Sequence, residues 1–201
     1  MKKLVLVLMA MIIGIGANAE LRWGPTASLN FNTFHWKEPL LETKTQVGFD
    51  AGIMTEIMIP GIGFGVDAGL TYGMRRGRVD FGKWEAWSSE GFGNENVMLH
   101  TINIPLHLRF KYTRLEGIEE TIAPLVFVGP LFQFNAATNC DAFQKPFGTI
   151  ALDFGLGCEL FQKYQISVGY LWGLSYSVKT RIMENLSARS DGFRLNFAIL
   201  F

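Results

Sequence analysis

The chain has 201 residues, which suits a single domain, and 49% of them are hydrophobic whereas 18% are charged. This composition is too apolar for a disordered chain, and its 17 Phe and 22 Gly make it unusually aromatic and glycine-rich for a cytosolic enzyme. The formal net charge is zero, so nothing indicates a nucleic-acid partner.

Residues 1–19 predict a cleaved secretory signal peptide. The chain starts with a basic pair, "KK", after Met, continues with an apolar run over 4–15, and reaches a small-x-small cleavage motif, "ANA", at 17–19. The apolar run is shorter than the ~20 residues of a membrane-spanning helix, and no Cys follows the motif to accept a lipid. We therefore expect cleavage before Glu20 and one mature domain over 20–201.

Most of the mature chain alternates apolar with polar or glycine residues at a period of two, which predicts β-strands with two unlike faces. In the first such segment, 21–33, Leu21 and Trp23 share one parity while Arg22 takes the other. The same pattern predicts strands at 47–59, 63–75, 97–112, 147–160, 165–179 and 193–201. An eighth strand, 123–134, is apolar at both parities, so the sequence leaves its two faces unassigned.

The connections between these strands alternate between short and long. The short ones are 60–62, 113–122 and 161–164, and the long ones are 34–46, 76–96, 135–146 and 180–191. Such alternation in an even-stranded meander is typical of outer-membrane β-barrels, which place their turns on the periplasmic side and their loops outside. We therefore expect both the N- and the C-terminus on the periplasmic side.

Alternation alone does not tell which face is inside, because a soluble lipocalin-like barrel also alternates, with a charged, Lys-rich face toward water. Across the first, second, third and seventh predicted strands, the polar parity carries many Gly with Ser, Thr and Asn, and no Lys before Lys179. Such a face fits the crowded lumen of a narrow barrel. The fold class that we predict is therefore all-β: an eight-stranded antiparallel up-and-down transmembrane β-barrel with its apolar face in lipid.

The last predicted strand supports this interpretation, because large apolar residues occupy every second position from Phe193 to Phe201. In lipid, every backbone N–H and C=O must be bonded within the protein, so a sheet can span a membrane only when it closes. We therefore expect the last strand to pair with the first.

Five stretches carry a resemblance to a known family: "LRWGPTASLNF", "INIPLHLRFKY", "VFVGPLFQF", "DFGLGCEL" and "ISVGYLWGLS", followed by a strand that ends in Phe201. Together they resemble the small outer-membrane β-barrel domain, PorT-like or "porin family", of Bacteroidetes-type bacteria. The resemblance covers nearly the whole mature chain and implies a Gram-negative outer membrane rather than a defined chemistry. One subgroup of that family resembles accessory parts of a protein secretion system. The terminal aromatic, Phe201, resembles the assembly signal that the outer-membrane insertion machinery reads.

Nine charged or titratable residues fall on the parity that we assign to the lumen. They are Arg22, Asp50, Glu56, Asp67, His107, Arg109, Asp153, Glu159 and Arg194. Buried charges are costly unless they are paired, so we expect a salt-bridge network that fills the lumen. The alternative is a narrow path for ions or small solutes.

Two candidate binding features lie at the expected outer end. The sequence "RRGR" contains Arg75, Arg76 and Arg78, and guanidinium groups bind phosphate bidentately, so contact with lipopolysaccharide phosphates is one hypothesis and a solvated loop is the other. Trp84 and Trp87 lie in the longest loop. Exposed aromatics of this kind suit a partner-binding loop, although they could equally fold onto the barrel rim.

Nothing in the sequence predicts a metal, a cofactor or a catalytic site. His35, His100 and His107 are scattered without metal-ligand spacing. A lipid A-modifying barrel enzyme needs a His with Ser or Asp at the outer rim, and the neighbours of His100 on the lipid face include neither. Cys140 and Cys158 are predicted at opposite ends of the barrel, which argues against a disulfide, and Cys158 is interpreted as a small lipid-facing hydrophobe.

The sequence therefore predicts a non-enzymatic outer-membrane β-barrel with a filled lumen and a structural or loop-mediated binding or assembly role in the cell envelope. A narrow porin-like channel is the alternative, and a lipid A-modifying enzyme is the third hypothesis. The expected partners are outer-membrane lipids and lipopolysaccharide, the outer-membrane insertion machinery, and a protein of the envelope. No cofactor is expected.

Overall fold

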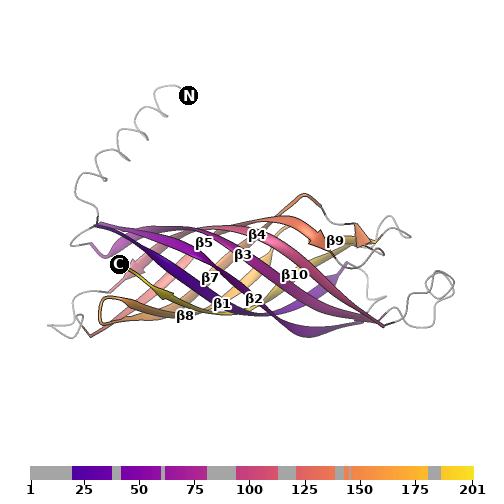
Figure 1. The fold of residues 1–201 in the computed structure, drawn as a ribbon, viewed down its shortest axis with the longest axis horizontal. Coiled ribbons are helices and arrows are strands. Elements are labelled where there is room, and N and C mark those ends of the chain that lie inside the picture. The colour runs from indigo at the N-terminus through magenta and orange to yellow at the C-terminus, as the bar shows by residue number, and fades with distance from the viewer. Residues whose placement is uncertain are drawn as a thin grey trace, which may run out of the picture.

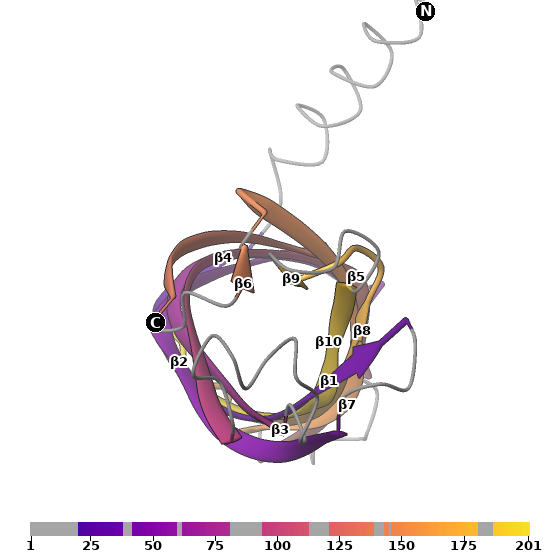
Figure 2. The same cartoon turned by 90° about the vertical axis from the view of Figure 1, so that its right-hand side faces the viewer.

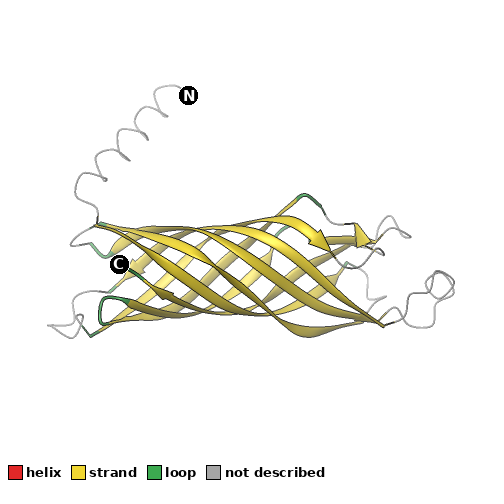
Figure 3. Ribbon diagram, viewed as in Figure 1, coloured by secondary structure: helices red, strands yellow, loops and turns green. Residues whose placement is uncertain are grey.

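The computed structural model describes residues 20–37, 42–59, 62–80, 94–112, 121–138, 143–144, 146–180 and 187–201. The expected signal peptide at 1–19, the loop residues Trp84 and Trp87, and Cys140 lie outside the described residues. Nearly all of the described chain is β-strand, as Figure 3 shows. No helix in that part of the chain is long and apolar enough to cross a membrane.

The strands form one antiparallel sheet that curls into a barrel (Figures 1 and 2). Its eight long strands are β1 (Glu20–Trp36), β2 (Glu42–Met58), β3 (Phe64–Asp80), β4 (Asn94–Lys111), β5 (Ile122–Thr138), β7 (Gly148–Leu160), β8 (Tyr164–Gly173) and β10 (Ser187–Ile199). Each long strand pairs with the next long strand along the chain. Two short strands, β6 (Phe143–Gln144) and β9 (Val178–Thr180), extend the sheet beside β10.

The sheet closes because β1 pairs with β10 as well as with β2. The β1–β10 ladder runs from Thr26 opposite Ala198 to Trp36 opposite Ala188. Beyond it, the backbones of Trp23 and Phe201 exchange two hydrogen bonds of 3.1 and 2.9 Å. The eight-stranded barrel and the pairing of the last strand with the first, both expected from the sequence, are confirmed.

One predicted strand, 165–179, is interrupted. It leaves the ladder after Gly173, and the backbone N–H groups of Leu174 and Ser175 both donate to the carbonyl of Ile150, at 3.0 and 3.1 Å. The Ser175 hydroxyl in turn accepts a hydrogen bond of 2.7 Å from the Ile150 N–H. Alternation continues through this turn, which is why the sequence pattern does not reveal the break.

The outer face of the barrel is apolar over most of the length of the eight long strands. Side chains such as Leu108 and Phe193 are 54% and 60% exposed, and the polar residues between them point inward. Contiguous apolar surface on this scale is typical of a protein that meets another apolar medium rather than water. The exterior therefore forms the lipid-facing band that a transmembrane barrel requires.

The structure assigns the two faces of β5, which the sequence left open. Leu125, Phe127, Leu131 and Gln133 are buried and point inward, whereas residues of the other parity, such as Val126, face outward. Leu131 packs in the lumen with Ala151 of β7 and Leu171 of β8. The lumen therefore contains a small apolar cluster of β5, β7 and β8 as well as charged side chains.

Candidate functional sites in the lumen and at the outer rim

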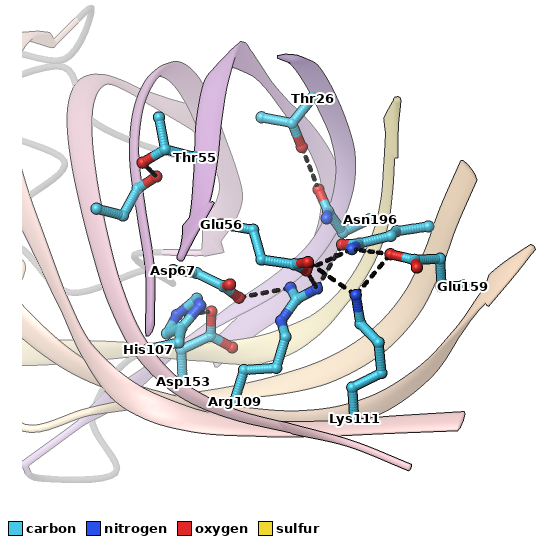
Figure 4. Close-up of polar contacts among 12 residues, drawn as sticks. Thr26, Thr55, Glu56, Asp67, His107, Arg109, Lys111, Asp153, Glu159 and Asn196 are labelled. Atoms are coloured by element: carbon cyan, nitrogen blue, oxygen red, sulfur yellow. Dashed lines mark hydrogen bonds and ion pairs between the residues drawn. The ribbon is translucent and has the colours of Figure 1, made fainter. Parts of the chain in front are cut away.

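A buried ionic cluster fills the lumen near the short turns. We call it the turn-end cluster; its members are Arg22, Glu56, Arg109, Lys111, Glu159 and Gln165 (Figure 4 labels four of them). Glu56, which is 0% exposed, accepts hydrogen bonds of 2.7 Å from Arg109 and from Lys111 and also pairs with Arg22. The Nη1 group of Arg22 donates to the backbone carbonyl of Gln162 in a turn, at 2.7 Å.

Glu159 is the second acceptor of the turn-end cluster. Its Oε2 atom accepts from Arg22 and Lys111 at 2.8 Å and from Gln165 at 2.7 Å. The Gln165 amide also donates to Glu56 at 2.7 Å, so that it joins the two carboxylates. Every charge of this cluster therefore has a partner of opposite charge, which offsets the cost of its burial.

The strand register explains why these residues meet. Arg22 lies directly opposite Glu56 in the β1–β2 ladder, and Glu56 lies directly opposite Asp67 in the β2–β3 ladder. Glu159 lies opposite Gln165 in the β7–β8 ladder. Residues directly opposite one another share a face, so a single parity choice brings these groups to the lumen together.

A second group, the mid-lumen cluster, lies further from the turns and consists of His107, Asp153 and Arg194. Asp153 pairs with Arg194, and its Oδ2 atom lies 3.0 Å from Nε2 of His107. The His107 ring packs against Phe127, with ring centroids 5.1 Å apart. Asp67 connects this cluster to the previous one, since it lies opposite His107 and its Oδ2 atom is 2.5 Å from Nη2 of Arg109.

A third group, the loop-end cluster, consists of Arg75, Asn32, Gln133, Asn103 and Asp50. Its member Arg75 points into the lumen, which corrects the assignment of this residue to the rim. Its side chain is 2% exposed and donates to Asn32 at 3.3 Å and, with the Gln133 amide oriented toward it, to the oxygen of Gln133 at 2.9 Å. Asp50 in the same region accepts from Asn103 at 3.3 Å. Arg75 faces the lumen because the alternation of β3 continues past Met74, so it is not placed to reach a lipid phosphate.

The described lumen is electrically neutral apart from His107. Five basic residues, Arg22, Arg75, Arg109, Lys111 and Arg194, face five acidic ones, Asp50, Glu56, Asp67, Asp153 and Glu159. Parity in the sequence places the nine residues expected there on one face. It also places Lys111, which shares the parity of His107 and Arg109, and the structure adds Gln165.

A cavity of about 40 Å³ lies beside the mid-lumen cluster, lined in part by Thr26, Ser28, Asp67, Arg109 and Asn196. At ~10–15 Å³ for each water, this volume corresponds to about three water molecules. In the described part of the chain, Oδ1 of Asp67 and Nε of Arg109 have no hydrogen-bond partner. Among the same residues, no group of three or more His, Cys, Asp or Glu side chains could hold a metal ion.

At the end of the barrel opposite the chain termini, Arg76 and Arg78 are exposed on the outward face of β3, within the strand rather than in a loop. On the same face, the hydroxyl of Tyr72 lies 2.6 Å from Nδ1 of His100 on β4. His100 therefore has a phenol beside it. On β7, Cys158 is a half-buried free thiol with the parity of the lipid-facing residues.

Comparison with known proteins identifies the fold of the chain but not its family. No family model matches the chain, and no curated protein sequence matches it. Among solved structures, it is similar to the outer membrane protein OprG of Pseudomonas aeruginosa, with 11% identity over 90% of this chain and 94% of OprG and a TM-score of 0.55. The chain therefore has the fold of a small outer-membrane β-barrel.

Two further structures align over similar lengths. Neisserial surface protein A has 11% identity, covers 90% of this chain and 99% of its own, and gives a TM-score of 0.49. The attachment invasion locus protein Ail of Yersinia pestis has 12% identity, the same two coverages and a TM-score of 0.42.

Proposed function

We propose that the protein is a non-enzymatic β-barrel of a Gram-negative outer membrane, with a structural or loop-mediated binding role in the cell envelope. The observation that carries this proposal is the described lumen, where buried basic and acidic side chains are equal in number and pair with one another, and where Leu131, Ala151 and Leu171 form an apolar cluster. A barrel filled in this way offers its outer surface and its loops, rather than a pore, to other molecules.

The proposed orientation places both termini in the periplasm. The described N- and C-terminal residues lie at the same end of the barrel, the end that also carries the tight turn at Phe161–Lys163 (Figure 1). Outer-membrane barrels keep short turns on the periplasmic side. Protease added to intact cells should cut loops at the other end and leave a tag after Phe201 untouched.

The finer family assignment, PorT-like, belongs to the same proposal and rests on the sequence stretches quoted above. It would add an envelope assembly, such as a secretion system, as the partner class. The loop with Trp84 and Trp87 is the proposed contact surface, and Phe201 is the proposed signal for the insertion machinery. Outer-membrane lipids, including lipopolysaccharide, would surround the apolar band.

Purification from native outer membranes tests the binding role. Tagged protein would be isolated in mild detergent, and its partners identified by mass spectrometry. The proposal expects a stoichiometric envelope protein that is lost when residues 81–93 are replaced by a short turn and kept when Cys158 is replaced by Ser. New lipid A masses in cells that overproduce the protein would instead indicate an enzyme.

A narrow channel is the second candidate, and the cavity beside the mid-lumen cluster favours it. The cavity shows that the ionic clusters do not fill the lumen completely. If its polar groups joined a continuous water path, small ions would cross the barrel. Single-channel recording separates this candidate from the filled barrel.

A further inference from the structure

We infer that the outward face of β3 and β4 carries a binding site for the phosphate group of a phosphorylated glycolipid in the outer leaflet. The site consists of Arg76 and Tyr72 on β3 and His100 on β4, and we call it the rim phosphate site. The inference rests on the proposed outer-membrane location and names one lipid class for that surface.

The register brings the three side chains of the rim phosphate site together. His100 lies directly opposite Met74, so it is the diagonal neighbour of both Tyr72 and Arg76 on the same face. The Tyr72 hydroxyl is 2.6 Å from Nδ1 of His100, and the two rings stack with centroids 6.0 Å apart. The Nη2 group of Arg76 lies 3.2 Å from the sulfur of Met74, the residue directly opposite His100.

Among the described residues, Arg76 is a charged donor with no strong acceptor. A guanidinium has five N–H groups, and among the described residues this one contacts only the thioether of Met74, a weak acceptor. No acidic residue lies opposite Arg76, diagonal to it on β4, or two residues away on β3. An arginine on the lipid-facing side is tolerated near the interface, and a phosphate there would satisfy its planar fork.

The neighbouring positions add positive charge. Lys44 of β2 lies directly opposite Arg78 of β3, and both are exposed. The acidic residues Glu42 and Asp80 lie opposite each other, closer to the strand ends than Lys44 and Arg78. Of these three cations, Arg76 is therefore the one nearest the apolar band and furthest along the strands from the two acidic residues.

The apolar surface below the site points to a lipid rather than to free phosphate. On the side away from the loops, the outward face continues with Leu70, Ile102 and Ile104, all of them exposed. Acyl chains of a lipid whose phosphate lies at Arg76 would lie along these side chains. Free phosphate would gain nothing from them.

Each member of the site has a distinct role. Arg76 would hold two phosphate oxygens in a bidentate arrangement. When Tyr72 donates its hydrogen bond to Nδ1, the neutral His100 ring keeps its proton on Nε2, which can then donate to a third oxygen. Tyr72 is therefore a positioning residue that fixes the orientation of the imidazole.

Native mass spectrometry of the full mature protein in mild detergent tests the site. The probes are bisphosphorylated lipid A and dephosphorylated lipid A with the same acyl chains. We expect Arg76→Gln to weaken binding of phosphorylated lipid A by about tenfold or more. This is the change in dissociation constant that follows the loss of one hydrogen bond to a charged group. The matched control is Arg189→Gln, because Arg189 is also exposed but lies 5.3 Å from the ring of Tyr176 on another part of the barrel.

Three results would overturn the inference: equal loss of binding in the two arginine variants, equal binding of the two lipids by the unaltered protein, or displacement of lipid A by millimolar inorganic phosphate. His100→Phe should weaken binding as Arg76→Gln does, and Tyr72→Phe should weaken it less. Heat-dependent gel mobility would verify that each variant is folded. Conductance of the same preparation reports on the proposed closed lumen separately, so either idea can fail alone.

Discussion

Arg109 on β4 donates a hydrogen bond of 2.7 Å to Glu56 on β2, although 53 residues and the whole of β3 separate them. Several ion pairs of the lumen therefore connect strands that are not neighbours in the sheet. Such cross-lumen contacts hold the barrel wall together in addition to the ladder hydrogen bonds. They also occupy space in the lumen near the turn end.

Replacing Glu56 should show how much this contact network stabilises the fold. Glu56→Gln keeps the shape of the side chain but leaves Arg22, Arg109 and Lys111 with one carboxylate fewer. We expect the free energy of unfolding to fall by about 3–5 kcal/mol, as when one partner of a buried ion pair is removed. Urea unfolding of the protein in lipid vesicles, followed by tryptophan fluorescence, measures this change.

The matched control is Glu20→Gln, which also removes a carboxylate that pairs with Arg22. The Glu20 side chain is 66% exposed, and its Oε1 atom lies 3.8 Å from the guanidinium. An exposed pair of this kind contributes at most about 1 kcal/mol. Equal effects of the two variants would mean that the turn-end cluster contributes no more than surface charge.

The sequence predicts which residues face the lumen but not how they pair. Parity alone puts Glu56, Asp67 and Arg109 on one face, because each follows the alternation of its own strand. The pairing of Arg109 with Glu56 depends on the stagger between β2 and β4, which closure of the barrel sets. The alternation of residues within one strand carries no information about the stagger between two strands.

Other features escape the sequence for equally physical reasons. The faces of β5 are unassigned because Leu125 and Val126 are both apolar, and only the register with β4 and β7 separates lumen from lipid. Arg75 looks like its neighbour Arg76, but one step along a strand reverses the direction of a side chain. Parity beyond Met74 would have separated the two.

The mid-lumen pair of Asp153 and Arg194 should be strongly coupled. Both side chains are buried, and each is the other's partner of opposite charge. In a double-mutant cycle with Asp153→Asn and Arg194→Met, we expect a coupling free energy of about 1–3 kcal/mol, because residues in one buried network do not act independently. Additive effects would contradict the pairing, and urea unfolding of the four proteins provides the measurement.

Gly77 should not tolerate a methyl group. It is buried on the lumen side of β3, and a Cβ there would overlap the ring of Phe34, which is 2% exposed and cannot move toward solvent. We expect Gly77→Ala to destabilise the barrel by about 1–3 kcal/mol, the cost of overpacking. Gly148→Ala is the control, because the nearest atom to its added Cβ is 3.7 Å away. Equal midpoints in urea would contradict this packing.

The terminal phenylalanine should matter more for assembly than for stability. Phe201 bonds to Trp23 through its backbone, and those bonds remain in Phe201→Ala. Its ring lies 4.4 Å from Nζ of Lys163, an exposed cation–π contact of about 0.5–1 kcal/mol. We therefore expect a small change in unfolding free energy but a clear fall in the amount inserted in cells. Phe197→Ala, which also removes an exposed ring, should insert better than Phe201→Ala.

Single-channel recording in planar bilayers tests the central claim, that paired charges and the apolar cluster of Leu131, Ala151 and Leu171 close the lumen. The purified mature protein would be inserted into the bilayer at about 1 M salt, with a trimeric porin as the positive control. At this salt concentration the field of a surface charge is screened within ~3 Å. The closed lumen predicts a baseline without steps for as long as the porin control conducts. Reproducible steps of uniform size from the unaltered protein would contradict it and make the protein a channel.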